Sequence, residues 1–169
     1  MAVIRDVTQA DLPALSASSG GNGWRGGDHP IWRQYLDEQR DGVRDLLVAA
    51  EGGEIVGYVG LLWRSHYPTF AAARIPEISD MVVARAWRRR GLGEQMIGAC
   101  EARARAAGHV TMGIGVGLYA DYGAAQRLYV RLGYRPDGRG VSYANAPAVP
   151  GQSYRLDDEL VLFLTKALT

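Results

Sequence analysis

The chain has 169 residues, of which 47% are hydrophobic and 22% are charged, and its formal net charge is +1. This length and composition predict a single globular domain spanning residues 1–169, with one sizeable core. A net charge so close to zero excludes a general electrostatic attraction to nucleic acid or to an anionic membrane, so neither is expected as a partner.

The first part of the chain predicts a strand, two helices and a loop. Residues 2–7 alternate weakly in hydrophobicity and predict the strand. Thr8 is a suitable N-cap for a helix over 11–18. The glycine-rich stretch 19–27 predicts a mobile loop, because ordering it costs much backbone entropy. A second helix is expected over about residues 30–40.

A hairpin and a further strand follow. The apolar runs 46–50 and 55–63 are joined by Glu51-Gly52-Gly53-Glu54, and glycine readily takes the positive φ that a tight hairpin turn needs. Residues 76–84 predict the next strand, which runs into the sequence WRRRGLG at 87–93.

A helix is predicted over 91–107, since Leu92, Met96, Ala99, Cys100 and Ala104 share one stripe. Cys100 is the only cysteine, so no internal disulfide is expected. Its position on the apolar stripe indicates a core residue rather than an acyl carrier. With no leader sequence and no long apolar run, the cytoplasm is the expected compartment.

The strand predicted over 109–116 has one face without side chains, because Gly113 and Gly115 alternate with apolar residues. Such a face occurs where a ligand or another backbone comes close, and equally at a kink or bulge. A helix is predicted over 121–132, with Gly133 as its C-cap. Residues 136–157 look like a loop, and 160–164 like a strand covered on both faces.

This order of elements predicts a mixed α/β or α+β sheet with helices on both sides. The turn before the central helix is the expected functional site, since unpaired N–H groups at a helix start attract anions and Gly91 and Gly93 allow close approach. Arg88, Arg89 and Arg90 add charge, which favours phosphate or pyrophosphate. A solvated arginine face beside a simple tight turn is the alternative.

Two common phosphate-binding motifs do not match this turn. A P-loop needs Gly-Lys followed by Ser or Thr, but Glu94-Gln95 follows Gly93. A dinucleotide-binding fingerprint needs a third glycine, and position 96 is methionine.

The wider pattern resembles the Gcn5-related N-acetyltransferases (GNAT). Arg88, Gly91 and Gly93 match that family's Arg/Gln-x-x-Gly-x-Gly/Ala signature, preceded by an apolar strand. Residues 125–134, AQRLYVRLGY, are similar to its Ala-x-x-Leu-Tyr-x-x-x-Gly-Phe helix, with Tyr134 as the final aromatic. The order of elements agrees over nearly the whole chain.

The resemblance implies a mostly antiparallel sheet of about six to seven strands, with a splayed strand pair that forms an acetyl-CoA cleft. Pantetheine would lie along one strand and the pyrophosphate would meet the helix start. The implied cofactor-binding residues are Met81, Val82, Val83, Arg88, Arg89, Arg90, Gly91, Leu92, Gly93, Glu94 and Tyr122. Tyr122 stands where the family usually has asparagine, which puts that one contact in doubt.

The resemblance also implies catalytic roles. Tyr129 matches the family's general acid, which protonates the departing CoA thiolate. Glu77 matches the general base of one branch; Asp80 and a water chain are the alternatives, although strand alternation directs Asp80 to the opposite face. The Met81 N–H is the expected donor to the thioester oxygen.

We therefore expect an enzyme that transfers acetyl from acetyl-CoA to an amine, with a small-molecule acceptor favoured. A protein N-terminus or lysine acetyltransferase and a catalytically silent acyl-CoA-binding module are the alternatives, and a homodimer is compatible with the resemblance. No metal site is expected, because His29, His66 and His109 lack ligands at suitable spacing. The acceptor pocket is expected to use 19–27 with Trp24, 65–67, and the region of Tyr143 and Tyr154. Asp157, Asp158 and Glu159 are expected to be a solvated turn, and the alternative is that they face the cleft and favour a cationic acceptor.

Overall fold

The computed structural model describes residues 1–17 and 31–169, which form two compact units. The first unit comprises Met1–Trp63 and Ile78–Arg103, and the second comprises Arg64–Glu77 and Ala104–Thr169. The loop predicted over 19–27 lies outside the described residues. The prediction of a single domain stays a prediction.

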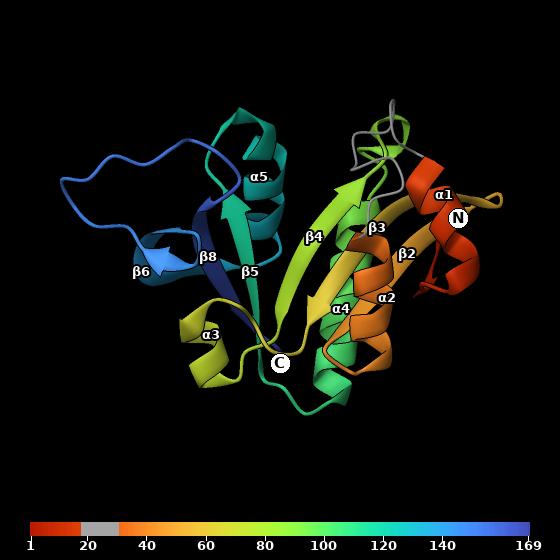
Figure 1. The fold of residues 1–169 in the computed structure, drawn as a ribbon, viewed down its shortest axis with the longest axis horizontal. Helices are drawn as coiled ribbons and strands as arrows, with labels where there is room; N and C mark the ends of the chain where they lie inside the picture. Colours follow the sequence, from red (N-terminus) through yellow and green to blue (C-terminus); the bar gives the residue numbers. More distant parts are fainter. Residues whose placement is uncertain (18–30) are drawn as a thin grey trace. The chain divides into compact units, whose positions relative to one another are not determined.

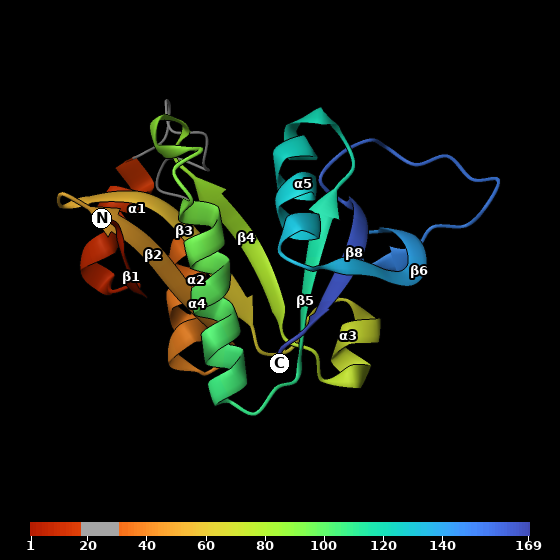
Figure 2. The same cartoon turned by 180° about the vertical axis from the view of Figure 1, so that it is seen from behind.

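The first unit is a sheet with a helix on each face. Its elements are β1 (Val3–Asp6), the short 3-10 helix η1 (Gln9–Asp11), α1 (Leu12–Ala17), α2 (Ile31–Arg40), β2 (Arg44–Glu51), β3 (Glu54–Leu62), β4 (Glu77–Val83), η2 (Arg85–Trp87) and most of α4 (Leu92–Ala106). The strand order is β1-β2-β3-β4, and both β1–β2 and β2–β3 are antiparallel. Figures 1 and 2 show α2 on one face and α4 on the other.

Local sequence patterns predict these elements well. Gly52 and Gly53 turn the β2–β3 hairpin with φ values of 61° and 87°, which confirms the glycine turn. Cys100 in α4 is completely buried, and this burial raises the pKa of its thiol to about 12. The thiol is therefore protonated and packed in the core, as the helical stripe predicts.

The N-terminal segment is held by one buried carboxylate. Asp11 Oδ2 accepts hydrogen bonds from Thr8 N at 2.7 Å and Thr8 Oγ1 at 3.0 Å, while the Arg5 guanidinium donates 2.8 Å bonds to both Asp11 oxygens. The Arg5 hydrogen bond is the main reason that the pKa of Asp11 falls to about 2. Thr8 thus starts a helical segment, as its sequence position predicts.

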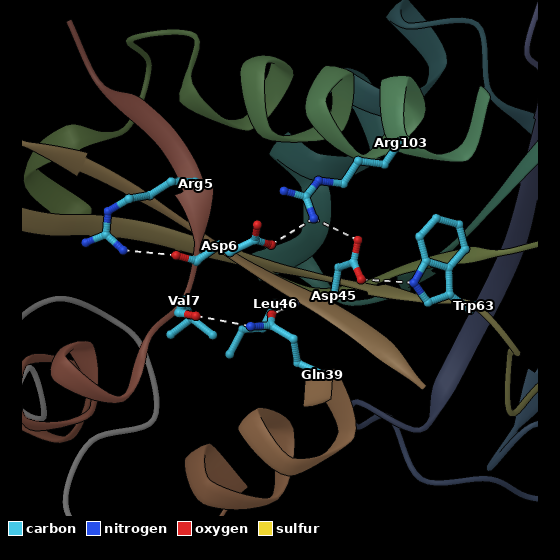
Figure 3. Close-up of polar contacts among 8 residues, drawn as sticks. All are labelled: Arg5, Asp6, Val7, Gln39, Asp45, Leu46, Trp63 and Arg103. Carbon is cyan, nitrogen blue, oxygen red and sulfur yellow. Dashed lines mark hydrogen bonds and ion pairs between the residues drawn. The ribbon is translucent and has the colours of Figure 1, made fainter. Parts of the chain in front are cut away.

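A second arginine ties α4 to two strands (Figure 3). Arg103 Nη1 donates 2.8 Å bonds to Asp6 Oδ1 at the end of β1 and to Asp45 Oδ2 in β2. Trp63 Nε1 donates to the other oxygen of Asp45 at 3.0 Å. One guanidinium therefore links the helix to the edge and the interior of the sheet.

The second unit is built on four strands. Its elements are α3 (Pro68–Ala73), β5 (Thr111–Gly117), η3 (Ala120–Tyr122), α5 (Gly123–Arg131), β6 (Arg135–Tyr143), β7 (Ala146–Pro147) and β8 (Leu160–Ala167). The strand order is β5-β8-β6-β7, with antiparallel pairs. In Figures 1 and 2, α3 and α5 lie on opposite faces of this sheet. Gly133 follows α5 with φ 93°, as expected for a glycine at a helix C-terminus.

The fold is mixed α/β with mostly antiparallel strands, as predicted, but two details differ. The described residues contain eight strands rather than six to seven. The loop predicted over 136–157 is wrong in its first half, because β6 and β7 lie there. Gly138 and Gly140 have positive φ, and the β6–β8 register shifts between Pro136 and Val141, so this strand lacks regular alternation.

The bare face of β5 is filled by side chains of the same unit. A Cβ at Gly113 would lie 2.3 Å from the Phe70 ring, and one at Gly117 would lie 2.3 Å from the Tyr122 ring. A Cβ at Gly115 would lie 2.9 Å from Val161. These glycines therefore make room for packing, which is the structural rather than the ligand explanation of the pattern.

No helix among residues 1–17 and 31–169 is both long enough and apolar enough to cross a membrane.

Candidate functional site

The turn before α4 presents open backbone donors. The first bond of this helix runs from Gln95 N–H to Gly91 O at 3.0 Å, so the N–H groups of Leu92 and Gly93 precede the first intrahelical bond. Gly91 has φ 78° and Arg89 has φ 63°. Left-handed residues of this kind gather successive N–H groups into an anion-binding concavity, so the turn fits a phosphate group.

The three arginines of this turn have different surroundings. Arg88 Nε donates to the Val83 carbonyl at 3.0 Å, and the Arg90 guanidinium lies 4.7 Å from the centre of the Trp87 ring. Arg89 is exposed and meets no side-chain partner within the part of the chain that the structure describes. None of the three has a carboxylate partner there, so their positive charge is not neutralised locally.

The end of β4 packs closely against β3 at Gly57. A Cβ at Gly57 would lie 2.9 Å from Val82 O, and Ala84 N donates to Val56 O at 2.9 Å. Because carbonyl directions alternate along a strand, the backbone groups of Met81 and Val83 point away from β3. These are the two residues predicted to hydrogen-bond pantetheine, although Val83 O already accepts from Arg88.

The alternation predicted for β4 fails at Asp80. This residue has φ 50°, in the left-handed region, so the strand is locally irregular. Asp80 Oδ2 lies 3.6 Å from Arg44 Nη1, and a Cβ at Gly60 would lie 3.2 Å from this Nη1 and 2.9 Å from Ser79 Oγ. Ser79 and Asp80 are therefore both near the same part of β3, and Asp80 is not directed to the face opposite Ser79.

Arg44 and Tyr35 surround this part of β4. Tyr35 Oη donates a 2.6 Å hydrogen bond to Asp80 Oδ2, and the Arg44 guanidinium stacks on the Tyr35 ring at 3.7 Å. Arg44 Nε donates to Glu38 Oε2. The sequence analysis missed Tyr35, Glu38 and Arg44. An arginine at the start of an apolar strand was the one available signal, because a buried charge requires partners.

Glu77, at the start of β4, is held by Ser65. The buried Ser65 hydroxyl donates to Glu77 Oε2 and accepts from Tyr67 N at 2.9 Å. The Tyr67 ring stacks on Phe163 at 3.8 Å, and its hydroxyl donates to Asp137. Ser65 and Tyr67 thus position Glu77 and the aromatic core, while His66 is exposed. The expected part of residues 65–67 in the acceptor pocket stays a prediction.

Tyr129 is buried in α5, with 6% of its surface exposed. Its ring lies 6.2 Å from that of Tyr134 and is tilted by 57°. Burial raises the pKa of its phenol to about 12. The hydroxyl has no hydrogen-bond partner among the described residues, so it is a protonated donor that remains available.

Tyr122 packs and forms its hydrogen bond within the second unit. Its ring covers Gly117, and its hydroxyl donates to Asp158 Oδ1 at 2.8 Å, where Tyr119 also donates. Burial and Asp158 raise the pKa of Tyr122. The predicted cofactor contact of Tyr122 stays a prediction. Asp157 accepts from Tyr143, so the stretch expected to be a solvated turn is also tied to tyrosines.

No group of three potential metal ligands gathers in the described residues. His109 Nδ1 lies 3.2 Å from Arg74 O, and His29 falls outside the described part of the chain.

Comparison with known proteins identifies a sequence family. A sequence model of the acetyltransferase (GNAT) family matches residues 7–134, which is most of the chain. No curated protein gives a significant match.

Solved structures share the fold across the full length. A ribosomal-protein-alanine N-acetyltransferase from Brucella melitensis is 25% identical, with a TM-score of 0.67, covering 98% of this chain and 99% of that one. An N-acetyltransferase from Staphylococcus aureus Mu50 is 20% identical with a TM-score of 0.70, covering 100% and 99%. An aminoglycoside 6'-N-acetyltransferase complexed with coenzyme A is 18% identical with a TM-score of 0.64, covering 99% and 97%.

Proposed function

Because the chain belongs to the acetyltransferase (GNAT) family, we propose that it transfers the acetyl group of acetyl-CoA directly to an amine. The observation that carries this proposal is the turn before α4. Its N–H groups after Gly91 make no intrahelical bond, and its arginines meet no carboxylate within residues 1–17 and 31–169. A diphosphate can accept hydrogen bonds from these N–H groups, and its negative charge complements the positive charge of the arginines. A similar fold has been solved with coenzyme A bound, which supports the same ligand here.

The proposed cofactor contacts follow from this turn. The N–H groups of residues 88–94 meet the pyrophosphate, and Met81 and Val83 meet pantetheine through their backbone. Arg89 is the side chain best suited to a further phosphate, because Arg88 and Arg90 already contact Val83 O and the Trp87 ring. Tyr122 is retained as a weaker candidate contact.

The acceptor must lose a proton before it attacks, because an amine is mostly an ammonium ion at neutral pH. We assign this step to Glu77, whose carboxylate is oriented by Ser65 and half-buried. The amine nitrogen then bonds to the thioester carbonyl carbon, and the carbon–sulfur bond breaks. Asp80 and a water chain are the alternative bases.

Tyr129 is the proposed general acid. Its phenol donates its proton to the sulfur as the thiolate leaves. Since burial raises the pKa of Tyr129 to about 12, the phenol stays protonated throughout the neutral and mildly alkaline range. Loss of rate between neutral pH and about pH 11 therefore does not come from Tyr129.

A small-molecule amine is the favoured acceptor, and a protein N-terminus or lysine is the second choice. The structural neighbours include one enzyme for an aminoglycoside and one for a ribosomal protein, so the fold serves both kinds of acceptor. The proposal includes a single domain over residues 1–169 and a cytoplasmic location, and a homodimer is compatible with it.

Ligand binding tests the first part of this proposal. Acetyl-CoA at 100 times its dissociation constant is expected to stabilise the fold by about 2.7 kcal/mol. Calorimetry and thermal melting with CoA and acetyl-CoA measure this effect. No heat and no melting shift at millimolar ligand would exclude the proposed binding site.

Turnover of an amine panel, followed by release of free CoA thiol, separates an enzyme from a silent binding module. Tyr129→Phe is expected to lower kcat by about a hundredfold, with little effect on cofactor affinity, because it removes only the proton donor. An unchanged kcat would remove Tyr129 from the mechanism. Cofactor binding without turnover of any amine would favour the silent module.

The role of Glu77 is tested through the pH profile. Glu77→Gln is expected to lower the rate most at low pH, where the amine most needs an efficient base. The isosteric amide still accepts the Ser65 hydrogen bond, so the fold is expected to persist. A pH profile identical to that of the unmodified protein would transfer the role to Asp80 or water.

A further inference from the structure

The two carboxylate oxygens of Asp80 have different surroundings. Oδ2 accepts from Tyr35 Oη at 2.6 Å and lies 3.6 Å from Arg44 Nη1. Oδ1 contacts no hydrogen-bond donor in the described part of the chain. The side chain is 37% exposed, so one oxygen is fixed by the protein while the other is available to a ligand.

The guanidinium behind Asp80 is held in place. Arg44 is only 5% exposed, its Nε donates to Glu38, and its plane stacks 3.7 Å from the centre of the Tyr35 ring. Gly60 makes room for it, since a Cβ there would lie 3.2 Å from Nη1. The guanidinium therefore cannot rotate freely, and it is a fixed cationic neighbour of the Asp80 carboxylate.

The ion pair between Arg44 and Asp80 leaves polar groups without hydrogen bonds. Arg44 Nη1 and Ser79 Oγ are both buried and make no hydrogen bond. A structural salt bridge of ordinary kind would bring Asp80 to within hydrogen-bond distance of Nη1, because leaving a buried donor unpaired is costly. Instead Asp80 Oδ2 accepts from Tyr35 and lies 3.6 Å from Nη1.

The two carboxylates beside Arg44 differ in how they meet it. Glu38 accepts hydrogen bonds from Gln34 and from Arg44 Nε. Asp80 approaches the guanidinium only to 3.6 Å, and its Oδ1 meets no donor among the described residues. A partly exposed and oriented carboxylate oxygen is complementary to a cation that donates N–H bonds.

We propose that Asp80 Oδ1 binds the ammonium form of the acceptor, and that Tyr35 and Arg44 act as positioning residues. The identity of the cation as the acceptor rests on the proposed acetyl transfer. Asp80 thus selects acceptors that carry a primary ammonium group over uncharged molecules of the same shape. This role is distinct from proton removal, which is assigned to Glu77.

Direct binding tests the proposal without turnover. Butylammonium chloride and its uncharged isostere butanol are titrated into the protein saturated with CoA, and amide NMR shifts are followed at Ser79 and Asp80. The unmodified protein is expected to bind butylammonium more tightly than butanol. Asp80→Asn keeps an acceptor for Tyr35 but removes the charge, and is expected to weaken butylammonium binding by about tenfold, with no change for butanol.

Two further variants separate charge from positioning. Asp41→Asn removes the same charge from an exposed residue that follows α2, and is expected to change neither affinity. Tyr35→Phe keeps the charge of Asp80 but frees Oδ2, and is expected to weaken butylammonium binding by about threefold while butanol binding stays constant. A purely structural role of Tyr35 would change both ligands equally.

The outcomes are distinct. Loss of ammonium preference in Asp80→Asn alone supports the site. Equal binding of butylammonium and butanol by the unmodified protein, shifts confined to other residues, or an unchanged preference in Asp80→Asn overturns it. Butylammonium binding at Asp80 without acetylation of any amine in the panel supports the site and contradicts the proposed transfer.

Discussion

Two groups of arginines in the first unit can be compared. Three arginines join separate elements by meeting carboxylates: Arg5 meets Asp11, Arg44 meets Glu38 and Asp80, and Arg103 meets Asp6 and Asp45. The three before α4 meet none in the described residues, because Arg88 contacts a carbonyl, Arg90 an indole ring, and Arg89 neither.

The two groups show that the same side chain serves two purposes according to its surroundings. Where an arginine joins helices to strands, a carboxylate neutralises it and the charge stays within the fold. Before α4, the charge stays unbalanced beside open N–H groups, which is the arrangement that attracts an anionic ligand. We therefore expect substitutions in the first group to lower the stability of the fold, and those in the second to weaken cofactor binding while stability stays unchanged.

The largest effect is expected at Arg44. Arg44→Met is expected to lower the free energy of unfolding by about 2–3 kcal/mol, because it leaves Glu38 and Asp80 without their cation; the value is below that of a fully buried pair since both carboxylates are partly exposed. Urea unfolding measures it. Arg40→Ala is the control, since Arg40 is 72% exposed and its partner Asp37 lies on the same helix. Equal free energies of unfolding for Arg44→Met and Arg40→Ala would contradict the structural role assigned to Arg44.

A smaller effect is expected at Asp11 and depends on pH. The pKa of Asp11 is lowered from 3.8 to about 2 in the folded protein, so its contribution is present above pH 3.8 and is lost as the pH falls through about 2. With Arg5 41% exposed, that contribution is about 1–2 kcal/mol after solvent screening. Asp11→Asn is expected to be less stable at neutral pH by this amount, and to converge on the unmodified protein in acid. Unfolding curves from pH 7 down to about pH 2 test this; a constant difference would contradict it.

The smallest effect is expected at Arg89. Arg89→Gln is expected to weaken CoA binding by about fivefold at low salt and less at high salt, since an exposed cation facing a phosphate is screened by ions. Its unfolding free energy is expected to stay unchanged. Arg33→Gln, which removes the same charge from an exposed position of α2, is the control. Equal CoA affinities for both variants would remove Arg89 from the cofactor site.

The candidate site was predictable where it depends on neighbours in sequence. The glycines before α4 and the Leu128–Tyr129 pair in α5 lie in short motifs, and a motif that starts or caps a helix acts over a few residues. Asp80 shows the opposite case. Strand alternation predicted the wrong face for Asp80, because its left-handed φ interrupts the alternation of side chains along β4. Its carboxylate then meets Tyr35 and Arg44, which come from distant parts of the chain.

The sequence by itself determined the hairpin at Gly52 and Gly53, the helices α4 and α5, and the family, because propensities, caps and short motifs are local. Only the tertiary structure decided what fills the bare face of β5, where Phe70 and Tyr122 take the space beside the glycines. It also decided that β6 exists despite its proline and glycines. In these places packing between remote segments outweighs local preference, and a single sequence does not record which remote segments meet.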